Sequence, residues 1–112
     1  MTEPAPPILA WEDNDLLSVY SSVRAFCSYV EWIDVLDGVY EVFDSAGRTL
    51  VPIVSGYLVF GVSVDESKPA DTELMTRRVR SYLELVGPEL YGFADVAGAS
   101  LGDMLAAMSD RP

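Results

Sequence analysis

The sequence predicts a single α+β domain with helices packed against an antiparallel sheet. Its 112 residues suffice for one core, and half of them are apolar, which is typical of a folded chain. Strand-like segments follow one another in the middle of the chain, whereas segments with helical periodicity flank them. The predicted order is a helix, a three-stranded antiparallel meander, a second helix and a short C-terminal helix, packed as a two-layer sandwich.

The N-terminal third is expected to contain a tail, a short strand and a helix. Residues 1–7 are proline-rich and lack a periodic apolar face, which predicts a flexible tail ahead of one acidic domain over residues 8–112. Residues 8–11 suit a short edge strand. The acids of residues 12–15 suit a helix N-terminus, and apolar residues then recur at intervals of three and four. We therefore expect the first helix over residues 15–31.

Three consecutive segments predict the meander. Residues 39–43 are β-branched and aromatic, and a glycine-containing loop over 44–48 leads into a return strand over 49–54. A tight Ser55-Gly56 connection opens the third strand, over 57–64. Pro52 lacks an amide donor, so its strand is expected at a sheet edge or at a bulge.

Strict alternation along the third strand predicts which side chains are buried. One set, which we expect to face the core, consists of Leu58, Phe60, Val62 and Val64. The opposite face of the sheet is mixed in polarity, and we expect it to be open to solvent or to a partner.

The C-terminal third predicts two helices. Asp71 and Glu73 favour a helix start, and Gly87-Pro88 favours its end. Its expected buried stripe is Leu74, Met75, Val79, Tyr82, Leu83 and Val86. Residues 89–98 suit a loop, and Ser100 with Asp103 matches a capping box that opens a short final helix.

Charge and composition exclude several classes of function. With 18 acids against 7 bases, the chain has a formal net charge of −11, which disfavours nucleic acid and anionic membranes and favours a basic protein partner. A lone Cys27 and the absence of His remove disulfides, nucleophilic triads and zinc sites, and no phosphate-binding loop is present. We expect no catalysis, no cofactor and no metal. The acidic, proline-rich start lacks a secretory signal, which predicts a cytoplasmic protein.

An acidic run with flanking aromatics is the candidate partner-binding site. Five acids within residues 31–44 are not interrupted by any base, so they form either a solvated rim or a surface for a positively charged partner. Aromatic anchors ringed by charge are typical of specific interfaces. The predicted partner-binding residues are Glu31, Trp32, Asp34, Asp37, Glu41, Phe43, Asp44 and Tyr57.

The only basic cluster is Arg77, Arg78 and Arg80. We interpret it as neutralising nearby acids, including Glu73 and Glu84, because an anion pocket would need further donors from elsewhere in the chain.

Residues 31–48 contain Ile-Asp-Val, then Gly-Val-Tyr-Glu, then the hairpin Asp-Ser-Ala-Gly-Arg. This segment resembles one in small acidic bacterial proteins, several of which look like immunity proteins that neutralise toxins exchanged between competing bacteria. The resemblance implies an inhibitor that covers the basic site of a toxin or enzyme, and it transfers no catalytic residue. Two alternatives stay open: a homodimeric interaction module that uses the mixed sheet face, and a nucleic-acid mimic that occupies a DNA-binding protein.

Overall fold

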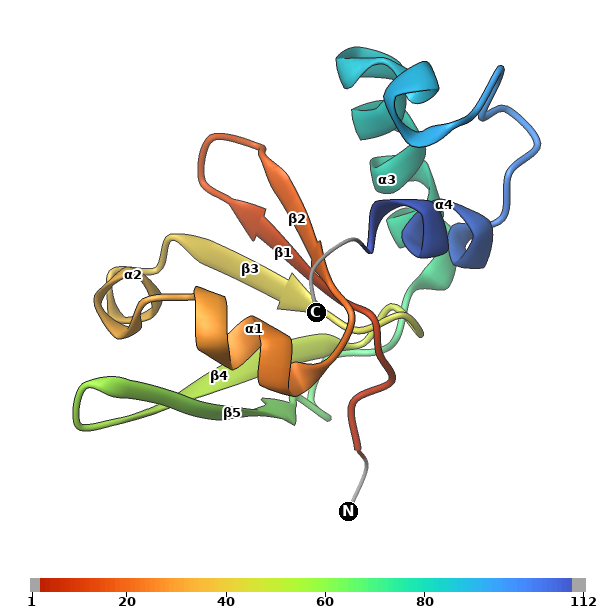
Figure 1. Cartoon of the computed structure of the whole chain (residues 1–112). Coiled ribbons are helices and arrows are strands. Elements are labelled where there is room, and N and C mark those ends of the chain that lie inside the picture. Colours follow the sequence, from red (N-terminus) through yellow and green to blue (C-terminus); the bar gives the residue numbers. More distant parts are fainter. Residues whose placement is uncertain (1–2, 110–112) are drawn as a thin grey trace.

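The computed structural model describes residues 3–109 and shows an α+β domain built on a five-stranded antiparallel sheet (Figure 1). The strand order is β2-β1-β3-β4-β5. The strands are β1 (Ile8–Glu12), β2 (Leu17–Tyr20), β3 (Tyr40–Phe43), β4 (Thr49–Ser55) and β5 (Leu58–Val64). The α+β class is confirmed, and the predicted three-stranded meander corresponds to β3, β4 and β5, which form only part of the sheet.

The first helix was predicted too early in the chain. Residues 17–20 form β2, which pairs with β1 from Leu17↔Trp11 to Tyr20↔Ile8. The connecting turn closes with a 2.8 Å bond from the amide of Glu12 to the carbonyl of Leu16, and Asp15 adopts a left-handed φ of 65°. Since β1 also pairs with β3, it is an inner strand and not an edge.

The helical part of that region is divided into two short helices. Helix α1 (Val23–Tyr29) begins at Ser22, whose hydroxyl accepts a 3.0 Å bond from the amide of Ala25. It ends at Val30, which has extended backbone angles. Helix α2 (Trp32–Leu36) follows after this break.

The C-terminal helices are close to the prediction. Helix α3 (Thr72–Val86) is capped by Asp71 and ends at Gly87, and α4 (Leu101–Met108) is capped by Ser100. A short 3₁₀ helix, η1 (Pro88–Tyr91), lies in the segment expected to be loop. In the predicted stripe of α3, Met75, Val79 and Leu83 are buried and Leu74 is exposed.

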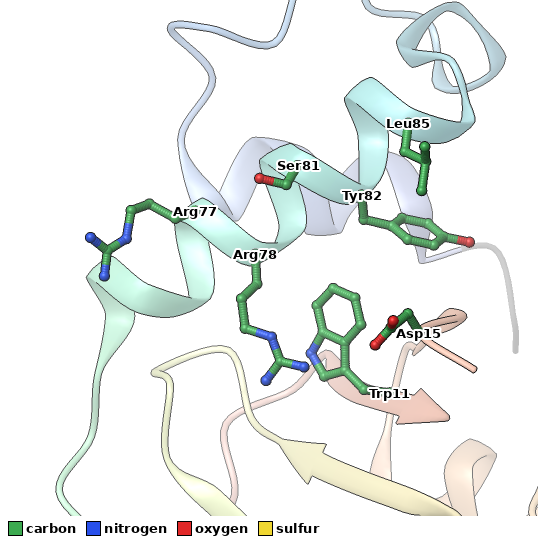
Figure 2. Close-up of a pocket in the computed structure, with 7 residues that line it drawn as sticks. All are labelled: Trp11, Asp15, Arg77, Arg78, Ser81, Tyr82 and Leu85. Carbon is green, nitrogen blue, oxygen red and sulfur yellow. The ribbon is translucent and has the colours of Figure 1, made fainter. Parts of the chain in front are cut away.

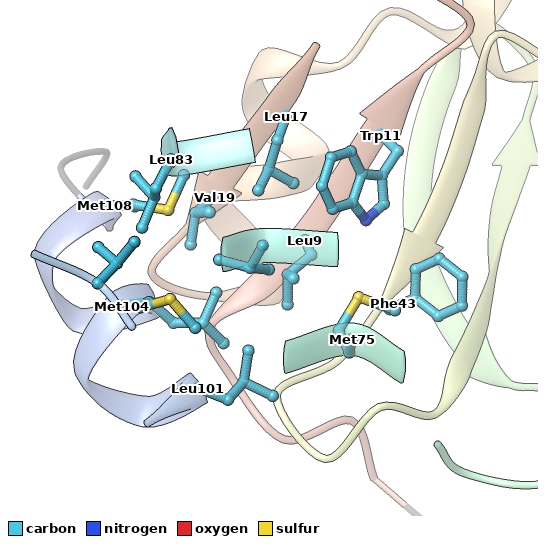
Figure 3. Packing of buried hydrophobic residues seen from close by; sticks show 13 residues of the cluster. Leu9, Trp11, Leu17, Val19, Phe43, Met75, Leu83, Leu101, Met104 and Met108 are labelled. Atoms are coloured by element: carbon cyan, nitrogen blue, oxygen red, sulfur yellow. The ribbon is translucent and has the colours of Figure 1, made fainter. Parts of the chain in front are cut away.

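Helices cover both faces of the sheet, so the domain has three layers and not the two expected. Alternation along β1 directs Ile8 and Ala10 into the core beneath α1 and α2, and Leu9 and Trp11 into the core beneath α3 and α4 (Figures 1 and 3). The second core consists of Leu9, Trp11, Leu17, Val19, Phe43, Met75, Val79, Leu83, Val96, Leu101, Met104, Leu105 and Met108.

A β-bulge reverses the predicted sidedness at the start of β5. The pairing of β4 with β5 shifts register between Ile53 and Val54. As a result Val59 is buried, whereas Leu58 and Phe60 are 66% and 74% exposed. Val62 and Val64, further along the strand, do pack against the core as predicted. The bulge directly follows Pro52, whose strand β4 is flanked on both sides and is therefore not an edge.

None of the helices between residues 3 and 109 has the length and apolar character that crossing a bilayer requires.

Candidate partner-binding surface

Three chain connections meet at one end of the sheet. The register of β1 with β3 pairs Glu12 with Tyr40, so the turn after β1 lies beside the link from α2 to β3. The β4–β5 turn reaches the same end, on the left in Figure 1. We call the carboxylates gathered there the acidic end: Glu12, Asp13, Asp15, Glu31, Asp34, Asp37 and Glu41.

The acidic end has little internal neutralisation. Its one ion pair among the described residues joins Glu41 to Arg78 at 3.1 Å. Burial, and then the charges of Glu12, Asp34 and Glu31 among others, raise the pKa of Tyr40 to about 12. Nearby negative charges have this effect because they disfavour the formation of another anion. The shift therefore indicates that carboxylates from two separate segments act on one point of the surface.

An aromatic pair joins α2, the helix that carries Asp34 and is flanked by Glu31 and Asp37, to the β4–β5 turn. The rings of Trp32 and Tyr57 are 5.2 Å apart and inclined by 61°, an edge-on contact. Trp32 is half-buried against the α1 side of the sheet, and Tyr57, in the β4–β5 turn, is 79% exposed. Tyr57 is thus a large side chain held in place by Trp32 and presented to solvent.

Two predicted site residues lie inside the protein and are removed from the candidate surface. Phe43 is 8% exposed and belongs to the core beneath α3 and α4 (Figure 3). Asp44 is completely buried. Its carboxylate accepts hydrogen bonds from the amides of Ala5, Ala46 and Arg48, and from the Arg48 guanidinium at 2.8 Å. Asp44 therefore holds the β3–β4 turn together. It also binds Ala5, and Arg48 donates to the carbonyl of Glu3 at 2.8 Å, within the segment that was predicted to be a flexible tail; residues 1–2 lie outside the described part.

The other six predicted site residues are accessible at one end of the molecule. Glu31 and Asp37 are exposed at the two ends of α2, Asp34 lies in its first turn, and Glu41 is exposed on β3. Trp32 and Tyr57 complete the set.

Sequence reasoning missed three members of the acidic end: Glu12, Asp13 and Asp15. These acids were interpreted as the N-terminus of a helix. The signal for a hairpin turn was nevertheless present, because Asn14 lies between two apolar segments and Leu17 and Val19 alternate with Ser18 and Tyr20.

A groove next to the acidic end is lined by two arginines of α3, Arg77 and Arg78 (Figure 2). It has a volume of about 330 Å³ and is lined by Trp11, Asp15, Arg77, Arg78, Ser81, Tyr82 and Leu85. The Arg78 guanidinium lies 4.4 Å from the centre of the Trp11 ring, and the Tyr82 ring meets Trp11 edge-on at 5.9 Å. Packing against the Trp11 ring therefore holds the Arg78 guanidinium in position beside Glu41.

One of the three arginines, Arg78, neutralises an acid of the described chain as predicted, although the acid is neither Glu73 nor Glu84. Arg78 neutralises Glu41, and Arg80 donates to the carbonyls of Val96 and Ala99, which fixes the loop before α4. Arg77 makes no ion pair with residues 3–109, and neither Glu73 nor Glu84 is paired within that range.

The structure offers little for metal or thiol chemistry in the part of the chain that it describes. Residues 3–109 contain no group of three or more His, Cys, Asp or Glu placed to hold a metal ion. Burial raises the pKa of the Cys27 thiol, which lowers the fraction of reactive thiolate at neutral pH.

No protein-family model matches this chain, and comparisons with curated proteins and with solved structures give no significant match. Its function is therefore argued from its own surface.

Proposed function

We propose that the protein is a non-catalytic binding protein whose acidic end engages a basic protein, as an immunity-type inhibitor engages a toxin or enzyme. The observation that carries the proposal is the presence, at one end of the sheet, of seven carboxylates and of the exposed Tyr57 with its support Trp32.

The two components of this surface have different physical roles. Largely unpaired carboxylates attract a basic partner over several ångströms and accelerate encounter, an effect that falls as salt rises. The aromatic pair supplies apolar area at low entropic cost, which slows dissociation once contact is made. Together they predict fast, salt-sensitive association combined with slow dissociation.

Affinity capture with two matched triple variants tests the proposal. One variant neutralises the acidic end by Glu31→Gln, Asp34→Asn and Asp37→Asn. The control variant removes the same charge from exposed acids on the helical side, by Glu84→Gln, Glu89→Gln and Asp103→Asn. All three proteins are immobilised and exposed to cell lysate at low and at high salt, and retained proteins are identified by mass spectrometry.

We expect the unmodified protein and the control to retain the same basic protein at low salt, and the acidic-end variant to lose it. A purified partner would then show an association rate that falls with salt and with the acidic-end substitutions, and a dissociation rate that rises with Tyr57→Ala. A partner retained equally by both triple variants would contradict the proposal.

A further inference from the structure

An apolar face of the β4–β5 hairpin has no cover within the described chain. Four large apolar side chains point to solvent there: Val51, Ile53, Leu58 and Phe60, which are 46%, 42%, 66% and 74% exposed. We call them the open face. Their neighbours Leu50 and Val59 are buried against the opposite side of the sheet, so the open face is the outward surface of the hairpin, with Phe60 at the bulge.

The helices explain why this face is uncovered. Helices α3 and α4 pack on the part of the sheet formed by β1, β2 and β3, through residues such as Leu9, Val19 and Phe43. No residue of β4 or β5 belongs to that core. Figure 1 accordingly shows α3 and α4 towards the β1–β2 side, away from β5 at the other edge of the sheet.

Charge indicates what can cover the open face. Residues 49–64 contain no Asp, Glu, Lys or Arg, although the chain as a whole has a net charge of −11. A basic partner would find no carboxylate to pair with on this hairpin. Two copies of the chain repel each other overall, and this hairpin is a surface where they can approach through strands that carry no charge themselves. Its nearest carboxylates border it at Ile53, where Glu3 and Glu66 line the same hollow.

The area suits a weak dimer. From the exposed fractions of its four side chains, the open face presents on the order of 500 Å² of apolar surface, so two copies would bury about 1,000 Å², the lower limit for a specific interface. A patch of this size is in the range of the largest apolar patch on a typical monomer, and such patches are often functional.

We propose that the open face binds the same face of a second copy about a two-fold axis, giving a dimer with a dissociation constant in the micromolar range. Such a contact is self-complementary and uses the one open face of each copy, so it closes at two. It goes beyond the proposed function, because it involves none of the residues of the acidic end.

Sedimentation and light scattering over a range of concentrations test the dimer. We expect a mass rising from 12.2 kDa in dilute solution towards twice that value when concentrated. Added salt should strengthen the dimer, because it screens the repulsion between two copies that each have a net charge of −11. The melting temperature should rise with protein concentration, because association stabilises the folded state. Leu58→Glu on β5 and Ile53→Glu on β4 should each keep the protein monomeric at concentrations where the unmodified protein is a dimer.

Leu90→Glu is the matched control, because Leu90 is a comparably exposed leucine on η1, at 72%. It adds the same charge, and we expect it to leave the dimer intact. All three sites are exposed, so circular dichroism should show native folds for all variants.

Three outcomes would overturn the inference. A protein that stays monomeric at high concentration has no such interface. Loss of the dimer in Leu58→Glu but not in Ile53→Glu would assign the contact to the edge of β5 and not to the open face. A dimer broken equally by Leu90→Glu would show a non-specific response to charge. The acidic-end triple variant should still dimerise, so failure of this inference and failure of the proposed function are separable.

Discussion

Asp44 shows how a residue that looks like part of a binding surface can be structural. Its buried carboxylate accepts four hydrogen bonds, one of them from the guanidinium of Arg48. Asp44→Asn would replace one acceptor oxygen by an amide donor that faces N–H groups. We expect it to lower the free energy of unfolding by about 3 kcal/mol, measured by urea denaturation. Asp37→Asn, at an exposed position, should change stability by less than about 0.5 kcal/mol. Equal effects would show that Asp44 is as accessible as Asp37.

Tyr40 reports the electrostatics of the acidic end. The pKa of its phenol is raised from 10.0 to about 12, first by burial and then by neighbouring carboxylates such as Glu12. In the unfolded chain the phenol ionises near its ordinary pKa. Its contribution to stability is therefore fully present below about pH 10 and is lost as pH rises towards 12. We expect Tyr40→Phe to raise the midpoint of alkaline unfolding, followed by circular dichroism.

Ultraviolet titration of the phenols gives a second measurement at the same residue. Glu12→Gln should lower the pKa of Tyr40 without returning it to 10.0, because burial is the larger cause. If Glu12→Gln left the pKa of Tyr40 unchanged, the inference that the Glu12 carboxylate acts on Tyr40 would be contradicted.

At the scale of elements, the β3–β4 turn is anchored to the start of α3. Gly47 has φ of +77°, and its carbonyl accepts a bond from the amide of Asp71 at 3.1 Å. A Cβ at this position would lie 2.7 Å from backbone atoms of Asp71 and Thr72. Gly47→Ala therefore combines left-handed strain with a backbone clash, and we expect a loss of about 3 kcal/mol of stability in denaturant unfolding.

The matched comparison for Gly47 is Gly56→Ala in the β4–β5 turn. Gly56 also has a left-handed φ, of +61°, but its Cβ would meet nothing within 4 Å. Strain alone should cost about 1 kcal/mol there. Equal losses at the two positions would mean that the turn can move away from α3.

The same elements show how far the sequence determines the fold. Helix α3 and the cap of α4 were predictable because periodicity, caps and the Gly87-Pro88 stop agree. Residues 17–20 were not, because Leu17 and Tyr20 fit a helical spacing while Leu17 and Val19 fit a strand. Pairing with β1 decides between helix and strand here, and the local sequence pattern contains no information about that pairing.

The site was predictable to a similar extent. Six of the eight predicted residues are accessible at one end of the sheet, because α2 leads into the start of β3 and the β4–β5 turn lies at the same end of the meander. Phe43 and Asp44 could not be excluded by sequence. Phe43 is buried beneath α3, a later segment, and Asp44 is enclosed by its bonds to Ala5 and to the β3–β4 turn. The exposed Leu58 and Phe60 depend on the bulge, which strict alternation cannot reveal.

At the scale of the whole molecule, the charge distribution should make the acidic end a source of instability. A net charge of −11 repels itself, and seven of the 18 acids are concentrated at one end with a single ion pair among the described residues. Salt screens this repulsion, so the melting temperature should rise with added salt. The triple variant Glu31→Gln, Asp34→Asn, Asp37→Asn should melt above the unmodified protein at low salt, and the two melting temperatures should converge at high salt.

The control triple on α3, η1 and α4 removes the same net charge from more dispersed positions, and we expect a smaller gain in melting temperature from it. Equal gains would mean that repulsion is spread evenly over the molecule. A larger gain at the acidic end would show that the protein retains a clustered charge that lowers its own stability, as expected of a surface kept for a basic partner.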